Sequence, residues 1–543
     1  MPEKSPRYIV VLGSLMSGLG KGIVTASVGR ILQSKGYTVS PIKFDGYLNV
    51  DCGTMNPLRH GEVFVLDDGT ECDTDFGTYE RFLNHSIVGM NSITGGKLFR
   101  KVIDKERAGG YLGRDVQIVP HLTDEIKAWI RNVGAGSKAD FVLIEVGGTV
   151  GDLENSYFIE AMRQMNREEG ERMLFMQLTY VTALSPGELK TKPTQHANRL
   201  IQSMGIQPKL IICRGDESLD KDAREKISLF CNVSPEDVFD DPKLETIYEL
   251  PIALEKQKFS TRLLGHFGLK AGDEDLKGWS AMVSRIKDPK NEINVAISGK
   301  YTAVKDAYVS VKEALVHAAA ANNTRVHIEW VDTERLEKEE GLKAAELLGK
   351  YDGIIVPGGF GSRGVEGKIM AIRHCREHEV PYLGLCLGMQ LMIVEYARDV
   401  AKMAGANSTE MDEKTAYPVI HIMPEQLKIK DKGATMRLGA WECVLSKGSK
   451  AQAAYGVEKM AERHRHRYEV NNELTPKLEE AGLVFSGRSP DGRIVEMCEW
   501  AAGWGVATQG HPELKSRLEA PAPLFVGFIK ACLKKQKERE EKK

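Results

Sequence analysis

Short apolar runs alternate with amphipathic stretches along the first half of the chain. Residues 8–12 (Y-I-V-V-L) form a β-branched run that ends at a glycine-rich loop, and residues 23–33 then have helical periodicity. Further apolar runs lie at residues 141–146, 174–181 and 210–213, and helix-like stretches separate them. Because strands that are buried on both faces read as continuous apolar runs, this alternation predicts a parallel sheet with helices on both sides.

The second half repeats this alternation after a break. Between residues 271 and 291 the apolar pattern thins into a polar segment with glycine and proline. A new series of apolar runs follows at residues 293–298, 326–331, 353–356 and 382–385. We therefore predict an α/β fold of two doubly wound domains: a P-loop-like domain at residues 1–270, a linker at 271–291 and a second domain at 292–543.

Composition narrows the class of protein. The 543 residues are too many for one core, and 42% hydrophobic with 28% charged residues is typical of a globular enzyme. A net charge of −2 favours neither nucleic acid nor membrane as a partner. The first residues lack the apolar centre of a signal peptide, and no apolar run reaches the roughly 18 residues that span a bilayer, so we expect a cytoplasmic protein. Nine scattered cysteines without a C-x-x-C pair indicate neither a disulfide framework nor a zinc site.

The loop after the first apolar run has features of a phosphate-binding loop. It reads G-S-L-M-S-G-L-G-K-G over residues 13–22, although Leu15 stands where the strict Walker pattern has its first glycine and Gly22 where it has a hydroxyl residue. Small residues let backbone N–H groups approach a phosphate at a helix N-terminus, and Lys21 supplies a mobile positive charge. The alternative is a glycine-rich strand-to-helix turn with a surface lysine.

Charged residues elsewhere in the first half suit a nucleoside triphosphate with magnesium. Asp73 and Asp75 lie in E-C-D-T-D-F-G, and Glu145 lies at the end of an apolar run. Magnesium prefers a few carboxylates together with phosphate oxygens and water. Lys190 and Lys192, in a loop that proline stiffens, add two cations for a triphosphate. Taken singly, each of these residue types is also common on solvated surfaces.

The second half carries a candidate nucleophile. Cys386 lies in G-L-C-L-G, the G-x-[SC]-x-G shape that exposes a side chain at a tight strand-to-helix turn, where a helix N-terminus and an imidazole can lower the thiol pKa. The alternative is a buried structural cysteine. His511 and Glu513, in H-P-E, supply a general base and the carboxylate that orients it. A backbone N–H within P-G-G-F-G, residues 357–361, is predicted to join that of Leu387 in an oxyanion hole.

These motifs resemble two known families. The second half is similar to class I glutamine amidotransferases, and the whole chain resembles the CTP synthase family. The blocks that carry the second resemblance are S-G-L-G-K-G from Ser17, N-V-D-C-G-T-M-N-P from Asn49, H-G-E-V-F-V from His60, Y-L-G-R-D-V-Q-I-V-P-H from Tyr111, E-V-G-G-T-V-G-D from Glu145, K-T-K-P-T-Q-H from Lys190, G-A-T-M-R-L-G from Gly433 and E-R-H-R-H-R-Y-E-V-N-N from Glu462.

The resemblance implies a coupled reaction. A class I glutamine amidotransferase domain at residues 292–543 would release ammonia from glutamine with a Cys-His-Glu triad. An ATP-dependent amidoligase domain at residues 1–270 would phosphorylate O4 of UTP, which ammonia then replaces to give CTP, ADP and phosphate. Magnesium as cofactor, GTP as allosteric activator, CTP as feedback inhibitor and assembly into a homotetramer, with filaments in some members, are implied as well.

The resemblance also implies roles for individual residues. Cys386, His511, Glu513 and Lys21 would be catalytic. ATP would contact Gly18, Leu19, Gly20, Lys21, Gly22, Ile23, Asp75, Pro242, Lys243 and Leu244. UTP or CTP would contact Ser17, Asp152, Leu153, Glu154, Lys190, Thr191, Lys192, Pro193, Thr194, Gln195 and Lys226. Glutamine would contact Gly359, Leu387, Gly388, Met389, Gln390, Glu410 and Arg467, and magnesium would be held by Asp75 and Glu145.

Several positions depart from the family pattern. Ser14 stands where a second glycine is usual, Gly46 replaces a proline, Gly110 replaces an aspartate, and Gly510 replaces a bulky aromatic residue. The loop before Lys190 is one residue shorter than usual. We expect these changes to affect ligand affinity and inhibition more than the reaction.

Two other functions stay open from the sequence. An ATP-dependent ligase that amidates a carboxylate would use the same coupling, but K-T-K-P-T-Q-H and E-V-G-G-T-V-G-D disfavour it. A regulatory binding protein would keep the fold without turnover, and fold alone would not decide between the two. The presence of all six reactive groups disfavours such a scaffold; these are Lys21, Asp75, Glu145, Cys386, His511 and Glu513.

Overall fold

The computed structural model describes residues 5–14, 16–56, 60–185, 187–273, 275–300, 305–338, 342–422 and 436–541. Leu15, residue 274 of the predicted linker and residues 433–435 of G-A-T-M-R-L-G lie outside the described residues. The chain divides into two compact units, Met1–Cys52 with Thr78–Val283, and Gly53–Gly77 with Ser284–Lys543. The sequence pattern gives no indication that residues 53–77 group with the second unit.

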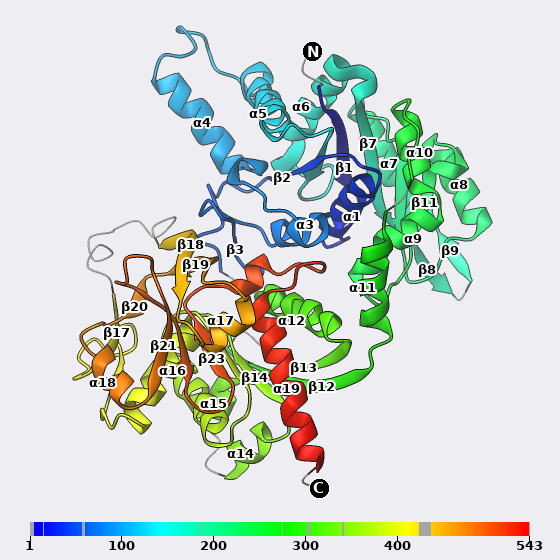
Figure 1. Ribbon diagram of the computed structural model, residues 1–543. Coiled ribbons are helices and arrows are strands. Elements are labelled where there is room, and N and C mark those ends of the chain that lie inside the picture. The colour runs from blue at the N-terminus through cyan, green and yellow to red at the C-terminus, as the bar shows by residue number, and fades with distance from the viewer. Residues whose placement is uncertain are drawn as a thin grey trace. The chain divides into compact units, whose positions relative to one another are not determined.

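The first unit is built on a seven-stranded sheet in which all neighbouring strands are parallel (Figure 1). This confirms the predicted parallel sheet. In sheet order the strands are β11 (Val238–Asp241), β10 (Leu210–Arg214), β7 (Met173–Tyr180), β1 (Arg7–Gly13), β6 (Phe141–Val146), β2 (Val39–Asp45) and β5 (Ser92–Thr94).

Helices cover both faces of this sheet, so its strands are buried on both sides. On β1, Tyr8, Val10 and Leu12 belong to one hydrophobic cluster, and Ile9 and Val11 belong to another. The first cluster includes residues of α4 (Gly95–Arg107), α5 (Thr123–Ser137) and α6 (Leu153–Glu169). The second includes residues of α1 (Lys21–Ser34), α9 (Leu250–Lys256) and α10 (Phe259–His266). Between strands the unit also contains α7 (Lys192–Ser203) and α8 (Lys221–Cys231).

The predicted linker contains a helix, α11 (Lys277–Lys287). Its Trp279 is fully buried, donates from Nε1 to the carbonyl oxygen of Tyr248 at 2.7 Å and lies under the guanidinium of Arg30. Although residues 271–291 are mostly polar, Trp279 attaches this segment to the first unit, because one tryptophan buries a large apolar surface.

The second unit contains a nine-stranded mixed sheet (Figure 1). Five parallel strands are followed by four antiparallel ones, in the order β13 (Thr324–Asp332), β12 (Asn291–Gly299), β14 (Gly353–Val356), β15 (Tyr382–Leu385), β23 (Gly505–Thr508), β22 (Val495–Trp500), β21 (Leu483–Arg488), β18 (Arg437–Leu445) and β19 (Lys459–His466).

Helices pack on both faces of the parallel part. Residues of α15 (Val365–Glu377) and α16 (Leu387–Asp399) belong to one hydrophobic cluster, and residues of α12 (Val309–Ala321) and α19 (Pro523–Glu541) to another. Smaller elements of this unit are α17 (Lys450–Tyr455), α18 (Thr475–Glu480) and a three-stranded sheet of β16 (Asn407–Ser408), β17 (Pro418–Ile422) and β20 (Tyr468–Val470).

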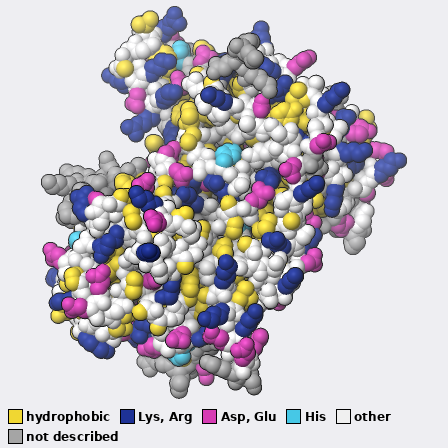
Figure 2. All heavy atoms as spheres, viewed as in Figure 1, with side chains coloured by type: hydrophobic (Ala, Val, Ile, Leu, Met, Phe, Trp, Pro, Cys, Tyr) yellow, Lys and Arg dark blue, Asp and Glu magenta, His cyan; other side chains and the backbone are white. Residues whose placement is uncertain are grey.

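The surface carries both signs of charge. On the face that Figure 2 shows, basic and acidic side chains are interspersed, in line with the near-zero net charge. All nine cysteines are buried free thiols. None of the described helices has the length and apolar character that a membrane crossing requires.

Candidate active sites

The first unit gathers its predicted nucleotide-binding segments at the carboxyl ends of parallel strands. The phosphate-type loop follows β1, Glu145 lies next to the end of β6, and residues 242–244 follow β11. Ligands of doubly wound sheets bind at this edge, where backbone N–H groups of helix N-termini are available. The fold thus brings segments from distant parts of the sequence to one edge.

The loop enters α1 through two glycines with left-handed backbone conformations. Gly18 has φ 75°, and Gly20, which caps α1, has φ 87°. A Cβ on Gly20 would lie 2.1 Å from Nη1 of Arg214, which donates to the carbonyl oxygen of Leu19 at 3.0 Å. Both the backbone and Arg214 therefore exclude a side chain at position 20.

Lys21 is the first residue of α1, and its side chain folds back across the end of β1. Its Nζ donates to the carbonyl oxygen of Gly148 at 2.7 Å, and the residue is only 8% exposed. A Cβ on Gly13 would lie 2.7 Å from this Nζ, so a side chain at the end of β1 would displace the lysine from this position. An ammonium group that donates to a carbonyl can exchange that acceptor for phosphate oxygens, which accept more strongly.

Residues 190–195 do not form the predicted loop. Lys190 ends β9 (Glu188–Lys190), which pairs with β8 (Thr182–Ser185), and Lys192 begins α7 with a proline directly after it. Proline favours the first turn of a helix as much as a loop, because the N–H there has no intrahelical acceptor. Gln195 is buried and donates to Oγ1 of Thr191 at 3.0 Å. The two lysines thus lie at a helix N-terminus, which suits an anion.

A buried polar network connects α7 with the phosphate-type loop. Gln177 of β7 is fully buried; its Nε2 donates to Oγ of Ser14 at 3.3 Å and to the carbonyl oxygen of Thr194 at 3.5 Å. Its Oε1 accepts from Nδ2 of Asn198 at 2.7 Å. Ser14, which stands where the family pattern has glycine, is therefore a member of this network.

Glu145 fits the chemistry of a magnesium ligand. It is 2% exposed, and the hydroxyl of Tyr79 donates to its Oε2. Within the described part of the chain, no three His, Cys, Asp or Glu side chains are grouped so that they could enclose a metal ion. Magnesium keeps several waters and takes only one or two carboxylates besides phosphate, so a sparse donor set fits it. Asp75 begins α3 (Asp75–Leu83) and groups with the second unit.

The other predicted nucleotide contacts lie near the strand ends or on helices. Leu153, the first residue of α6, is 83% exposed. Gly46 packs closely on Glu154, because a Cβ there would lie 2.8 Å from its carbonyl oxygen, so the proline of the family pattern would not fit. Further predicted positions are Asp152 before α6, Lys226 on α8, and Pro242, Lys243 and Leu244 after β11.

In the second unit, Cys386 lies at a tight turn between β15 and α16. Its φ of 52° and ψ of −103° are rare for a residue with a side chain, and it is 4% exposed. A Cβ on Gly384 would lie 2.8 Å from Cβ of Ala507, and one on Gly388 would lie 2.1 Å from the carbonyl oxygen of Val356. Glycine is therefore required on both sides, as the G-x-C-x-G spacing predicts.

His511 and Glu513 form an ion pair beside this cysteine, with 2.7 Å between Nδ1 and Oε1. Nε2 of His511 is buried without a hydrogen-bond partner among the described residues. A Cβ on Gly358 would lie 3.0 Å from Cε1 of His511 and 3.6 Å from Cβ of Cys386, so the two side chains are neighbours. Burial lowers the pKa of His511, but the Glu513 carboxylate and the Cys386 sulfur outweigh it and raise this pKa well above its usual value. Such an imidazole can hold a proton taken from the thiol.

The turn at Cys386 between β15 and α16 is called the elbow below. A cavity of about 110 Å³ opens beside it. It brings together Cys386 and four of the predicted glutamine-binding residues, Gly359, Gln390, Glu410 and Arg467. Met389, by contrast, is fully buried in the hydrophobic core, and Leu387 and Gly388 form the first turn of α16. A larger cavity of about 540 Å³ also reaches Cys386, His511 and Glu513.

The P-G-G-F-G loop offers free amide groups next to the elbow. The N–H groups of Gly358, Gly359 and Leu387 donate no hydrogen bond to any residue that the structure describes. The N–H of Gly361, by contrast, donates to Oε1 of Glu410 at 2.7 Å. Unpaired N–H groups beside a nucleophile are what a tetrahedral oxyanion requires.

Three polar side chains around this loop have no counterpart among the predicted residues. Lys300 follows β12 and donates to the carbonyl oxygen of Gly361 at 3.2 Å, and Lys368 of α15 donates to that of Pro357 at 3.3 Å. Nε2 of Gln509 lies 3.6 Å from Sγ of Cys386. A lysine within E-G-K-I looks like a solvated helix residue, whereas Gln509 could have been noticed from its position two residues before His511.

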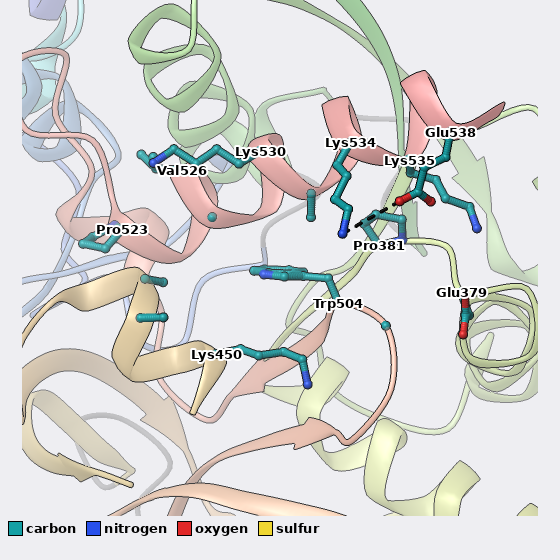
Figure 3. A pocket seen from close by; sticks show the side chains of 15 residues that line it. Glu379, Pro381, Lys450, Trp504, Pro523, Val526, Lys530, Lys534, Lys535 and Glu538 are labelled. Atoms are coloured by element: carbon teal, nitrogen blue, oxygen red, sulfur yellow. Dashed lines mark ion pairs between the residues drawn. The ribbon is translucent and has the colours of Figure 1, made fainter. Parts of the chain in front are cut away.

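A further hollow of about 660 Å³ lies elsewhere in the second unit (Figure 3). The indole of Trp504 lies between Lys450 and Lys534 there, and Pro381 at its rim precedes β15 at the end opposite Cys386. None of the predicted site residues lines this hollow.

Comparisons with known proteins cover nearly the whole chain. Residues 7–269 match the family model of the CTP synthase N-terminus, and residues 303–531 match that of class I glutamine amidotransferases. The chain is 50% identical over 532 residues to a CTP synthase of Symbiobacterium thermophilum, which covers 97% of this chain and 98% of that protein. It is 48% identical over 539 residues to one of Methanocaldococcus jannaschii, with 98% and 99% covered. A solved Trypanosoma brucei CTPS glutaminase domain with bound acivicin is 37% identical, with a TM-score of 0.42, and covers 45% of this chain and 94% of that domain.

Proposed function

The chain belongs to the family of glutamine-hydrolysing CTP synthases, and we propose that Cys386, His511 and Glu513 are its glutaminase triad. The observation that carries the proposal is the His511–Glu513 pair, with Glu513 buried and His511 half-buried, beside a cysteine in a strained elbow. His511 takes the thiol proton, the thiolate attacks the glutamine amide, and His511 returns the proton to the leaving ammonia. Water then releases glutamate from the thioester. The N–H groups of Gly359 and Leu387 stabilise the oxyanion in both steps.

Two charged residues of the elbow cavity suit the amino acid end of glutamine. Arg467 can pair with the α-carboxylate and Glu410 with the α-ammonium group, since both line the cavity beside Cys386. Burial raises the pKa of Glu410, against the effect of the Gly361 N–H that it accepts. A substrate ammonium group would favour the charged carboxylate.

In the other half-reaction the substrates are UTP, ATP and the ammonia from glutamine. ATP phosphorylates O4 of UTP, ammonia attacks C4, and phosphate leaves. Lys21 exchanges its Gly148 carbonyl for phosphate oxygens and balances charge on the transferring phosphoryl group. Glu145 and Asp75 would hold Mg²⁺, which neutralises phosphate charge. Residues 190–195 would bind the pyrimidine triphosphate, with the two lysines as its cations.

Regulation and assembly follow from the family resemblance. GTP would activate glutamine hydrolysis, and CTP would compete with UTP through Ser17 and residues 190–195. The chains would assemble into homotetramers and, under some conditions, filaments.

One assay with two nitrogen sources tests the proposed function. The full chain with UTP, ATP and Mg²⁺ should form CTP from glutamine and also from ammonium chloride at alkaline pH. Alkylation with iodoacetamide, mapped by mass spectrometry, should modify Cys386 unless glutamine is present, and should stop only the glutamine-dependent reaction. If alkylated Cys386 still supports glutamine hydrolysis, the triad is wrong; if CTP never forms from ammonia, the ligase assignment is wrong.

A further inference from the structure

Lys368 has a fully buried amino group that pairs with no carboxylate among the described residues. This lysine lies on α15 and is 0% exposed, and among the described residues the one hydrogen bond of its side chain runs from Nζ to the carbonyl oxygen of Pro357 at 3.3 Å. Burying an ammonium group costs several kcal/mol unless good partners surround it, so the weak pairing needs an explanation. Structural lysines usually keep their charged end in water.

The position of Lys368 links it to the elbow. Its Nζ lies 3.6 Å from where a Cβ of Gly359 would be, directly beside the P-G-G-F-G loop. The acceptor, Pro357, shares a peptide group with Gly358, whose N–H donates to no described residue and whose Cβ, if it had one, would lie next to His511 and Cys386. The amino group of Lys368 therefore bonds to the carbonyl of a peptide whose next residue, Gly358, neighbours His511 and Cys386.

The same loop has a second peptide with two charged partners. The carbonyl of Phe360 accepts from Nζ of Lys300, and the N–H on the other side of that peptide, from Gly361, donates to Glu410. A charged donor on a carbonyl polarises the peptide and strengthens the N–H across it as a donor. The Phe360–Gly361 peptide uses this polarised N–H for Glu410, whereas the N–H of the Pro357–Gly358 peptide donates to no residue that the structure describes.

We propose that Lys368 is a positioning residue for glutamine hydrolysis, which fixes the Pro357–Gly358 peptide and polarises the Gly358 N–H toward the oxyanion that forms at Cys386. This inference rests on the proposed function. It adds a third oxyanion donor, besides Gly359 and Leu387, and a buried charge that strengthens it. An electrostatic role of this kind acts in the transition state, so it changes kcat more than KM.

The test compares Lys368→Met, Lys368→Gln and Arg373→Met in the full-length enzyme. Methionine fills the space without a donor, and glutamine keeps an N–H donor without the charge. Arg373 lies on the same helix but pairs with Asp399. Glutamate release should show that Lys368→Met lowers kcat by about 10- to 100-fold, less than the loss of a whole oxyanion donor, with KM within about threefold. Lys368→Gln should fall between it and wild type, and Arg373→Met should match wild type.

Ammonia-dependent CTP formation is measured on every variant as the control for folding. It should stay at the wild-type rate. If Lys368→Met folds and its kcat is within twofold of wild type, the proposal is overturned, and if that variant does not fold, a wild-type kcat of Lys368→Gln overturns it instead. Loss of both nitrogen reactions in both variants would assign Lys368 a purely structural role. Cys386→Ala separates the two levels: glutamine hydrolysis that survives in it refutes the triad itself rather than the role of Lys368.

Discussion

The edges of the two sheets hold their reactive groups in different ways. Both units place them where a parallel strand ends and a helix begins. In the second unit, His511 already pairs with Glu513 at 2.7 Å beside Cys386, and the cavity next to them is formed. In the first unit, Lys21 is bonded to the Gly148 carbonyl and Lys190 is paired with Glu188, so each cation has a partner from the protein itself.

This difference follows from the chemistry that each edge would perform. Glutamine hydrolysis needs a nucleophile, a base and an orienting carboxylate, all of which the chain can supply and hold in place. Phosphoryl transfer relies on charges that arrive with the nucleotide, so cations rest on protein acceptors until it binds. Substitutions in the triad should therefore abolish one step cleanly, whereas substitutions at the nucleotide edge should impair binding and chemistry together.

The largest effect is expected at Cys386. Cys386→Ala removes the nucleophile without adding bulk, so glutamine-dependent CTP formation should fall to background, a loss on the order of 10⁶-fold in kcat. Because the triad acts as a unit, adding His511→Ala should cost little more. Synthesis from ammonium chloride, followed by CTP absorbance, should stay near the wild-type rate. A further large loss in the double variant would mean that the two residues act independently.

At the nucleotide edge, Lys21→Ala should abolish CTP formation with either nitrogen source. The lysine balances charge on the transferring phosphoryl group, and loss of such a cation costs on the order of 10³-fold or more. Lys138→Ala, at the C-terminal end of α5, is the matched control and should change neither reaction. Near-normal synthesis from ammonium chloride in Lys21→Ala would contradict this role and would make the two edges more alike than proposed.

The sequence predicted those parts of the fold that apolar patterns specify. Residues 141–146, 353–356 and 382–385 match β6, β14 and β15 without error, because these strands are buried on both faces and glycine, proline or charged residues bound them. The antiparallel strand β19 was missed, since K-M-A-E-R-H-R-H is polar and its burial depends on ion pairs such as Arg463 with Asp67. Those pairs join segments almost 400 residues apart, which no local pattern reveals.

Among the candidate site residues, too, those with a local sequence motif could be predicted and those that depend on distant contacts could not. Cys386 could be predicted from the sequence because a nucleophile elbow needs glycines at fixed spacing in one stretch of chain, and His511 was predicted from the separate H-P-E motif; their catalytic roles stay predictions. Lys300 and Lys368 were not found, because their significance lies in the loop carbonyls that they reach and not in their neighbours in sequence. Residues 190–195 were placed in a loop, because proline marks loops and helix starts alike.

A smaller effect is expected at Gly510, which stands where the family pattern has an aromatic residue. A Cβ there would lie 2.9 Å from Cβ of Glu462 and 3.3 Å from Nε2 of His464, both on β19. The N–H of the next residue, His511, donates to the carbonyl oxygen of Arg463 on the same strand. Gly510→Phe should therefore push β19 away, misplace His511 and lower glutamine hydrolysis by about 10- to 100-fold.

The reaction at the nucleotide edge of the first unit is the control for this substitution. Ammonia-dependent synthesis of Gly510→Phe should match wild type, and Gly510→Ala should show an intermediate loss in the glutaminase assay. A wild-type rate of glutamine hydrolysis in Gly510→Phe would mean that β19 shifts to make room for the ring without displacing His511.

The smallest effect concerns stability and distinguishes a buried charge from a buried neutral amine. Burial, then the Lys300 ammonium, lowers the pKa of Lys368 to about 7, although Cys386 and Glu410 act in the opposite direction. An unfolded chain titrates lysine near its ordinary pKa of about 10.4. Between these two values the unfolded state binds the extra proton, so wild-type stability rises with pH; below about 7 both states are protonated, and the full cost of burying the charge remains.

Lys368→Met lacks this cost. It should therefore be more stable than wild type at pH 6, and its advantage should shrink by at most about 1.4 kcal/mol per pH unit between pH 7 and 10. Thermal unfolding at pH 6, 8 and 9.5 measures the difference, with Arg373→Met as the control whose difference from wild type should not vary with pH. An advantage of Lys368→Met that is constant over this range would mean that Lys368 does not change its protonation state there.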